Sequence, residues 1–336
     1  MTESIPSRDD AINVEELLDG QSLLVIGCTG FLGKVWLSLL LDRYPNVGTL
    51  YVMVRERKTM DADARFWAEI APSPVFDPIR AKRPGAQFDA YLREKIVPTG
   101  GDVSKENLGI SDALLERMKK DRPAIVNVAG VVDFNPPLDE ALGVNAFGAK
   151  HLVHVAKLLG DVPVLHTSTC YVVGRRDGLI VERNPLEFPF PRADELDVSH
   201  WDAENEIAEC LDVVEHTRRR VEDAPRQSHL LDEAKRNLRA RQEPLRGVAL
   251  DNELRKVKDR FVRQRLVDAG RERAEFWGWP NIYTYTKSIG EQVLLRSGLP
   301  VCIVRPSIVE SSVSYPCEGW CEGIQTSTPI MMTQVS

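Results

Sequence analysis

The sequence predicts an α/β fold built on a doubly wound parallel sheet, and three observations support this prediction. Short apolar, β-prone runs alternate with segments whose apolar residues recur at helical spacing. A glycine-rich turn joins the first apolar run to the first helical segment. A highly charged stretch interrupts the alternation after about residue 200, and the alternation resumes near residue 280. We therefore expect one α/β domain that carries a charged helical insertion.

The first strand, the glycine turn and the first helix together predict a dinucleotide site. Residues 23–26 are apolar and β-prone, as in a strand buried on both faces, and helical spacing begins at residue 31. Gly27 allows a tight turn, Gly30 lets the backbone approach a pyrophosphate, and Gly33 lets the helix pack close to the sheet. The N-terminus of the helix offers N–H groups and a positive dipole end to the phosphates. This arrangement is Rossmann-like, and its expected cofactor contacts are Gly27, Thr29, Gly30, Phe31, Leu32 and Gly33.

The end of the second expected strand, residues 50–54, predicts which nicotinamide cofactor binds. Enzymes that use NAD tend to place an acid here for the ribose 2′-hydroxyl, whereas those that use NADP place an arginine for the 2′-phosphate. Arg55 takes the first polar position, so we predict NADPH. The alternative is that the basic cluster at residues 55–58 is only a solvated turn.

The remaining elements follow in order along the chain. Residues 59–94 contain several prolines and predict a short helix near Phe66 followed by a loop. Further strands are expected at residues 95–98, 124–128, 162–165 and 301–304, and helices at residues 111–120, 138–159 and 281–296.

Residues near the ends of the third and fourth strands extend the expected cofactor site. Asp102 and Val103 follow the third strand, where the acid either faces the adenine ring or only caps a turn. Ala129 and Gly130 end the fourth strand, and their small size lets a cofactor lie across it. Asn145 lies inside the next helix, either as a cofactor contact or as a structural amide.

The composition is that of an ordinary soluble globular protein. The chain has 336 residues, 43% of them hydrophobic and 28% charged, and its net charge of -7 argues against nucleic acid as a partner. The 6 cysteines form no CxxC pair and lie mostly in apolar stretches, so we expect buried thiols in a reducing compartment and no metal site. Residues 1–19 form a polar leader, and no secretory leader or membrane span is apparent. We expect a cytoplasmic protein, with peripheral membrane contact left open.

The charged stretch at residues 200–279 predicts one or two long amphipathic helices. The favoured interpretation is a solvated insertion; the alternatives are a dimerisation arm, which would form a homodimer, and a lid that meets a lipid or a carrier partner. Around this insertion, residues 20–199 and 280–313 are expected to form the NADP-binding domain. Residues 314–336 are expected to begin a substrate-binding region.

A tyrosine and a lysine on the last expected helix predict the chemistry. Tyr283 and Lys287 are four residues apart and therefore share one helix face. A nearby ammonium is expected to lower the pKa of the phenol, which makes Tyr283 a usable general acid, and Lys287 can also bond the nicotinamide ribose. A hydroxyl after the fifth strand would hold the substrate oxygen, and the candidates are Thr169 and Ser168. The alternative is a plain helix surface, because this spacing also occurs by chance.

Five motifs in order resemble the fatty acyl-CoA reductases, a group of extended short-chain dehydrogenases/reductases. They are the glycine turn with Lys34 and Val35, residues 51–55, residues 168–172, residues 283–287 and residues 305–309. The charged insertion is similar to that of bacterial members. The resemblance implies NADPH as cofactor, a long-chain acyl-CoA substrate, and reduction to the aldehyde and often on to the alcohol. It also implies that Thr169 is the catalytic hydroxyl, with Ser168 as second choice, and that Pro306 to Ile308 line the nicotinamide pocket through their backbone.

Two departures from the family pattern stand out. Cys170 replaces the alanine that is usual after the Ser-Thr pair, which is a mild change. Family members continue well past the region of Gly319 and Trp320 into a smaller substrate-covering domain, so we expect a truncated C-terminal substrate region here. Either the chain is a fragment, or its acyl pocket is built otherwise.

Three other functions share parts of this pattern. A reductase that releases chains from an acyl carrier protein has every motif named above. A sugar-nucleotide epimerase or dehydratase of the same superfamily would retain its cofactor without consuming it. A non-catalytic NADP-binding protein would use the helical insertion to bind a partner, but the intact tyrosine and lysine argue against it.

Overall fold

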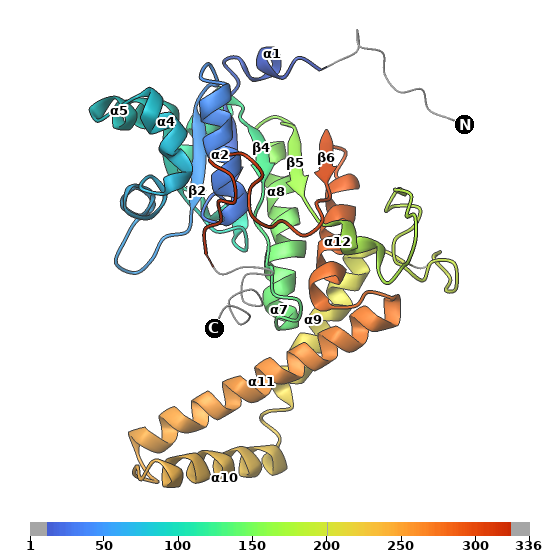
Figure 1. Cartoon of the computed structure of the whole chain (residues 1–336). Coiled ribbons are helices and arrows are strands. Elements are labelled where there is room, and N and C mark those ends of the chain that lie inside the picture. Colours follow the sequence, from blue (N-terminus) through green and yellow to red (C-terminus); the bar gives the residue numbers. More distant parts are fainter. Residues whose placement is uncertain (1–11, 200, 324–336) are drawn as a thin grey trace. The chain divides into compact units, whose positions relative to one another are not determined.

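The computed structural model describes residues 12–199 and 201–323, and it shows one parallel sheet of six strands in the order β3-β2-β1-β4-β5-β6 (Figure 1). The strands are β1 Leu23–Ile26, β2 Leu50–Val54, β3 Ile96–Gly100, β4 Ala124–Asn127, β5 Val164–Thr167 and β6 Val301–Val304. Every residue of β1 and β2 is buried, as continuous apolar runs in a parallel sheet require. The prediction of a Rossmann-like, doubly wound sheet is confirmed.

The strand order reverses beside β1, which pairs in parallel with β2 on one side and with β4 on the other. In open α/β sheets, ligands bind outside the carboxyl ends of the strands at this reversal point. The glycine turn leaves β1 here, and Ala129 lies just beyond the end of β4. The topology therefore places both predicted segments at the edge of the sheet where a nucleotide is expected.

Helices pack on this sheet to form the core around β1 and β2. Leu37 and Leu41 of α2 (Phe31–Arg43) belong to the same buried cluster as Val25 and Val52. The other helices before the insertion are α1 Val14–Leu18, α3 Ala62–Arg65, α4 Asp77–Lys82, α5 Ala86–Lys95, α6 Asp112–Asp121, α7 Leu138–Ala141 and α8 Phe147–Leu158. A π-helical turn, Leu142–Ala146, joins α7 to α8 and contains Asn145.

The prediction of a loop after Phe66 is wrong. A π-helical turn Phe66–Ile70, a 3-10 helix Pro74–Phe76 and the helices α4 and α5 fill this stretch. Ser73 caps the 3-10 helix by accepting a hydrogen bond from Val75 N, and Pro74 and Pro78 stand in the first turns of their helices. Proline is tolerated there because the N–H it lacks would be unpaired anyway. These prolines start helices, whereas the sequence analysis treated them as breakers.

The insertion consists of three helices, where one or two were expected. They are α9 Ala203–Arg219, α10 Ala224–Ala240 and α11 Val248–Trp277. Pro225 lies in the first turn of α10, and Gly278 ends α11 with a φ of +100°. Figure 1 shows α10 alongside α11, and a small core that includes Leu230 and Val257 lies between them.

The chain divides into two compact units. The first unit comprises the described residues up to Ala129, His151–Thr167 and those from Leu299 onward, and it contains the whole sheet. The second comprises Gly130–Lys150 and the described residues of Ser168–Gly298, including α9 to α12 (Ile282–Leu295). Within residues 12–199 and 201–323, none of the helices is both long and apolar enough to cross a membrane.

The expectation of buried cysteines holds for only part of the set. Cys28 and Cys210 are buried and Cys170 is half-buried, whereas Cys302, Cys317 and Cys321 are exposed. Cys302 lies on β6, which ends the described sheet and has alternate residues exposed. An apolar run at a sheet margin is therefore not evidence of burial on both faces.

Candidate active site

At two glycines of the turn in the first unit, neighbouring backbone leaves no room for a side chain. Gly27 has a φ of +97°, and a Cβ there would lie 2.6 Å from the backbone N of Ala129. A Cβ on Gly33 would lie 2.3 Å from the carbonyl oxygen of Gly27. At Gly30 the nearest neighbour would be 3.6 Å away, so packing within the protein does not require that glycine. Gly27 and Gly33 have the structural roles predicted for them, and Gly30 is open to a ligand.

The first turn of α2 presents the N–H groups expected at a phosphate site. Gly30 precedes the helix and supplies no side-chain cap, so the N–H groups of the first turn point outward without an intrahelical acceptor. Thr29 and Gly30 are exposed, and Phe31 and Leu32 are half-buried. The ring of Phe31 stacks on Trp320, with centroids 5.2 Å apart.

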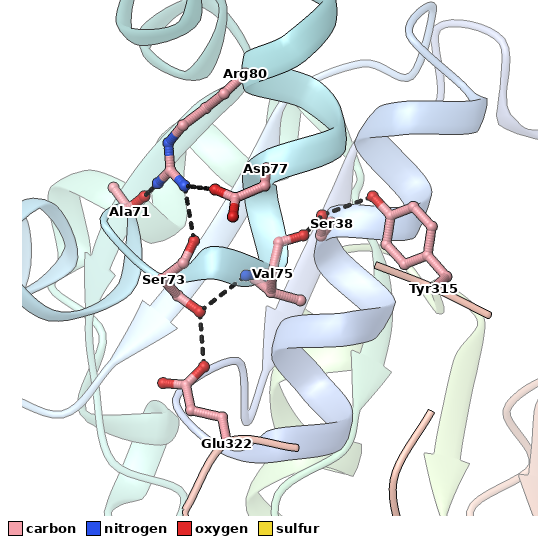
Figure 2. Close-up of polar contacts among 8 residues, drawn as sticks. All are labelled: Ser38, Ala71, Ser73, Val75, Asp77, Arg80, Tyr315 and Glu322. Carbon is pink, nitrogen blue, oxygen red and sulfur yellow. Dashed lines mark hydrogen bonds and ion pairs between the residues drawn. The ribbon is translucent and has the colours of Figure 1, made fainter. Parts of the chain in front are cut away.

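A segment from the end of the described chain packs along the same helix. Figure 2 shows Glu322 pointing at Ser73 and Tyr315 pointing at Ser38, with oxygen–oxygen distances of 2.6 Å and 2.8 Å. Glu322 also forms an ion pair with Lys34 of α2. The sequence analysis missed these contacts because nothing local in the sequence indicates which helix a C-terminal segment will cover.

A buried polar pair that the sequence analysis missed fixes the end of β4. The amide oxygen of Asn127 accepts a hydrogen bond from Ala129 N at 3.0 Å, and its amide nitrogen lies 3.0 Å from Nδ1 of His166 on β5. This pair orients the backbone against which Gly27 packs. An asparagine and a histidine within otherwise apolar strands were the available signal.

Arg55 and Asp102 of the first unit are brought together as an ion pair. Nε of Arg55 lies 3.2 Å from the Asp102 carboxylate, while most of the Arg55 side chain is exposed. Burial alone would raise the pKa of Asp102, but hydrogen bonds from Ser104 and the Arg55 charge hold it below its usual value. Asp102 caps a turn by accepting from Ser104 N at 3.0 Å, and the carbonyl of Val103 lies 2.9 Å from Nδ1 of His151.

In the second unit, the sequence around Asn281 sets the position of the tyrosine. Asn281 precedes α12 and accepts a hydrogen bond from Thr284 N at 2.9 Å, which is a strong N-terminal cap. Tyr283 is therefore in the first turn, and its own N–H donates to the carbonyl of Phe134 at 3.1 Å. The predicted helix bearing Tyr283 and Lys287 is confirmed.

Thr169 is the hydroxyl that meets the tyrosine. Its Oγ1 accepts a hydrogen bond from Tyr171 N at 3.3 Å, and its side chain is hydrogen-bonded to that of Tyr283. Ser168 is also buried, but in the described part of the chain its hydroxyl has no hydrogen-bond partner. The structure thus brings Thr169, and not Ser168, to Tyr283.

The pKa of Tyr283 differs from the expectation, and the pKa of Lys287 is shifted as well. Burial raises the pKa of the Tyr283 phenol, and the hydrogen bond with Thr169 only partly opposes it. Lys287 is 4% exposed, and its burial lowers its own pKa to about 8, although Glu291 acts in the opposite direction. The prediction that Lys287 lowers the pKa of Tyr283 is wrong here: burial raises that pKa, and the opposing effect comes from Thr169. Tyr283 is consequently a neutral proton donor at physiological pH.

Lys287 approaches the start of the second unit at Gly130. A Cβ on Gly130 would lie 2.9 Å from Nζ of Lys287 and 3.8 Å from the amide oxygen of Asn145. Asn145 donates from Nδ2 to Thr286 Oγ1 at 2.9 Å, and its amide oxygen is buried without a hydrogen-bond partner among the described residues. Single π-helical turns often occur at functional sites. Gly130, Asn145 and Lys287 therefore lie close together within the second unit.

In the first unit, the glycine turn and the uncapped N-terminus of α2 fit the phosphates of a dinucleotide. In the second unit, the buried amide oxygen of Asn145 lacks a hydrogen-bond partner among the described residues. Pro306 and Ile308 lie just past β6, where Pro306 is half-buried and Ile308 is exposed. Within residues 12–199 and 201–323 there is no cluster of three or more His, Cys, Asp or Glu residues that could hold a metal.

Comparison with known proteins identifies the family. Over residues 25–335 the chain matches the model of an NAD-binding family described as Male sterility protein. The chain belongs to this family. Fatty acyl-CoA reductase 1 of Arabidopsis thaliana is 31% identical over 325 residues, which cover 95% of this chain and 58% of that protein. The alcohol-forming fatty acyl-CoA reductase of Simmondsia chinensis is 30% identical over 318 residues, covering 94% and 56% respectively.

The predicted resemblance to fatty acyl-CoA reductases is thus confirmed, although the chain spans little more than half the length of these relatives. Among solved structures, the terminal R domain from the myxalamid PKS-NRPS biosynthetic pathway has a TM-score of 0.46 at 20% identity. The match covers 87% of this chain and 49% of that one. Because this likeness is weak, the fold assignment depends on the strand order and not on the superposition.

Proposed function

We propose that this chain carries the reductase site of an NADPH-dependent fatty acyl-CoA reductase. The observation that carries the proposal is the hydrogen-bonded pair Thr169 and Tyr283, with Lys287 one helical turn further along the same helix. Hydroxyl donors of this kind are what a developing oxyanion at a thioester carbonyl needs. The names of the curated relatives favour a fatty acyl-CoA as the substrate.

The binding residues divide according to the part of the cofactor that they contact. Gly27, Thr29, Gly30, Phe31, Leu32 and Gly33 would hold the pyrophosphate through backbone N–H groups and close approach. Arg55 would bind the 2′-phosphate, and Asp102 and Val103 the adenine. Ala129, Gly130, Asn145, Lys287, Pro306 and Ile308 would contact the nicotinamide portion.

The preference for NADPH is supported by the exposed Arg55 side chain at the end of β2. Its guanidinium pairs with Asp102 through Nε, which leaves its other donors available to a phosphate. A phosphate at this position would bring extra negative charge close to Asp102, so the arginine is needed more for NADPH than for NADH.

The chain's own groups would act on the substrate oxygen. NADPH, when bound, supplies the hydride that reduces the thioester carbonyl carbon. Thr169 and Tyr283 would donate hydrogen bonds to that oxygen as negative charge develops on it. Tyr283, kept protonated by its raised pKa, would transfer its proton, and the resulting hemithioacetal would collapse to aldehyde and thiol. A second round on the aldehyde would yield the fatty alcohol.

The test is to incubate the chain with NADPH and a series from octanoyl-CoA to stearoyl-CoA, then to identify products by gas chromatography. We expect NADPH oxidation coupled to the appearance of fatty aldehyde or alcohol. Activity only with acyl carrier protein substrates would favour the carrier-linked reductase. Binding of NADPH without oxidation by either substrate would favour a non-catalytic binder. A cytoplasmic location, membrane contact and a homodimer remain predictions.

A further inference from the structure

The helical insertion contributes a buried charge cluster to the second unit. Glu206 of α9 is 4% exposed, and its carboxylate accepts hydrogen bonds from Nε and Nη2 of Arg273 at 2.6 Å and 2.7 Å. It also accepts from Nε1 of Trp277 at 3.0 Å and from the hydroxyl of Tyr285. Four donors on one buried carboxylate form a saturated network, which is costly to disturb. We call Glu206, Arg273, Trp277 and Tyr285 the Glu206 cluster.

Tyr285 connects this cluster to the proposed catalytic helix. It lies on α12 two residues after Tyr283 and two before Lys287, so it projects from the opposite side of the helix. It is fully buried, and its hydroxyl contacts both Glu206 and the sulfur of Cys210, the latter at 3.0 Å. A buried tyrosine hydroxyl requires such partners, and here α9 of the insertion supplies both of them.

An aromatic layer extends the same support to the segment bearing Thr169. The rings of Trp277 and Trp201 have centroids 4.6 Å apart, and those of Trp279 and Tyr285 are 5.3 Å apart. Nε1 of Trp279 donates to the carbonyl of Val172 at 2.7 Å. Val172 belongs to the 3-10 helix Cys170–Val173 that Thr169 caps. Both members of the Thr169–Tyr283 pair are therefore backed by residues in or next to the insertion.

We propose that Glu206 is a positioning residue for the reduction: its hydrogen bond with Tyr285 holds α12, which carries Tyr283 and Lys287, and its bonds with Arg273 and Trp277 hold α9 against α11. The inference rests on the proposed function for its kinetic consequences. The insertion is then more than a solvated appendage, because Glu206 and its partners set the geometry of the reacting groups. A misplacement of about 1 Å costs an enzyme roughly 100-fold in rate, which is why a residue that touches no substrate can control turnover.

The matched control is a second buried glutamate in the same insertion. Glu253 is 5% exposed and accepts from Nδ2 of Asn237 at 2.9 Å and from Nη2 of Arg241 at 2.6 Å. Asn237 belongs to α10, Arg241 directly follows it, and neither lies on α12. Glu253→Gln therefore removes a comparable buried charge without touching the Glu206 cluster.

The test compares Glu206→Gln, Tyr285→Phe and Glu253→Gln, with each rate normalised to NADPH sites counted by fluorescence titration. We expect the first two variants to lose about tenfold or more in kcat, with the KM for NADPH within about twofold of wild type. Glu253→Gln should keep both constants within about twofold. A wild-type kcat in Glu206→Gln, or an equal loss in Glu253→Gln, would overturn the proposal.

Two further readouts keep the proposal testable whatever the activity. The double variant Glu206→Gln/Tyr285→Phe should have a kcat no lower than that of the slower single variant, because both substitutions break the same hydrogen bond. Additive losses in kcat would contradict this coupling. Hydrogen–deuterium exchange of residues 282–295 should accelerate in Tyr285→Phe and Glu206→Gln and not in Glu253→Gln. If the wild-type chain reduces no thioester, the proposed function fails, and exchange alone decides the positioning role. Should Glu206→Gln not fold, Tyr285→Phe, which lacks only one hydroxyl, decides it.

Discussion

The glycine turn of the first unit is made of backbone, whereas the tyrosine group of the second unit depends on side chains that burial has altered. At Gly27 and Gly33 the shape follows from the absence of a Cβ, and no titratable group takes part. At Tyr283 and Lys287 the backbone is an ordinary helix that many residue types can adopt, and the chemistry depends on side chains whose pKa values burial has shifted. Substitutions in the turn should therefore impair folding and cofactor binding, and those in the tyrosine group should impair turnover.

The largest effect should come from Tyr283→Phe. Removing the hydroxyl eliminates the proton donor and one oxyanion contact, so we expect kcat to fall by about 1,000-fold. The ring and its packing remain, so the Kd for NADPH should stay within about twofold. Steady-state kinetics and fluorescence titration measure the two quantities. A variant that keeps its rate would remove Tyr283 from the mechanism, and one that loses cofactor binding would end the contrast with the turn.

Gly27→Ala should damage the fold of the first unit. A methyl group would meet Ala129 N at 2.6 Å while the backbone is held at a positive φ, and the free energy of unfolding should drop by about 3 kcal/mol. Gly30→Ala is the control, because its methyl has 3.6 Å of clearance. It should fold normally but bind NADPH about tenfold more weakly if the pyrophosphate lies on that glycine. Urea unfolding and cofactor titration distinguish the two outcomes, and equal stability of both variants would contradict the packing argument.

Lys287→Met should stabilise the protein while abolishing activity. The pKa of Lys287 is about 8 in the folded chain against 10.5 for an ordinary lysine, so below pH 8 the fold carries the cost of a buried charge. By linkage the methionine variant should be about 3 kcal/mol more stable at pH 7. The difference should shrink as the pH rises from 8 to 10.5, where the wild-type lysine is neutral when folded but still protonated when unfolded. Urea unfolding at several pH values checks this, and a variant less stable than wild type at pH 7 would show that the charge is well compensated.

The same pKa value predicts the alkaline limb of the activity profile. Wild-type kcat/KM should fall as the pH rises above about 8, because Lys287 of the free chain then loses the proton with which it would bond the cofactor ribose. A profile that stays flat to pH 10 would mean that the lysine acts without its charge.

Arg55→Ala should have the smallest effect, and a selective one. The side chain is 62% exposed, so solvent screens its charge, and we expect the Kd for NADPH to rise about fivefold. The Kd for NADH should change by less than about twofold, since NADH lacks the 2′-phosphate. Competitive titration of the two cofactors measures the ratio. An unchanged ratio would leave Arg55 as a partner of Asp102 only.

The glycine turn was predictable from the sequence because its requirements are local. The strand, Gly27, Gly33 and the helix follow one another directly, and a backbone without space for a Cβ permits no other residue. The tyrosine helix was predictable for the same reason, from the helical spacing of its residues. The sign of the pKa shift at Tyr283 was not, because it depends on burial by segments distant in sequence. The Glu206 cluster was missed because Glu206, Arg273 and Tyr285 are each ordinary in a charged or amphipathic segment, and only tertiary packing brings them together.

The most direct measurement of the central claim follows the hydride itself. The chain is incubated with palmitoyl-CoA and NADPH deuterated at C4 of the nicotinamide, and the aldehyde or alcohol is analysed by mass spectrometry, with Tyr283→Phe in parallel. We predict deuterium on the former carbonyl carbon of the product from wild type, and product at or near background from the variant. Labelled product formed equally well by Tyr283→Phe, or no labelled product from a wild-type chain that binds NADPH, would contradict the account.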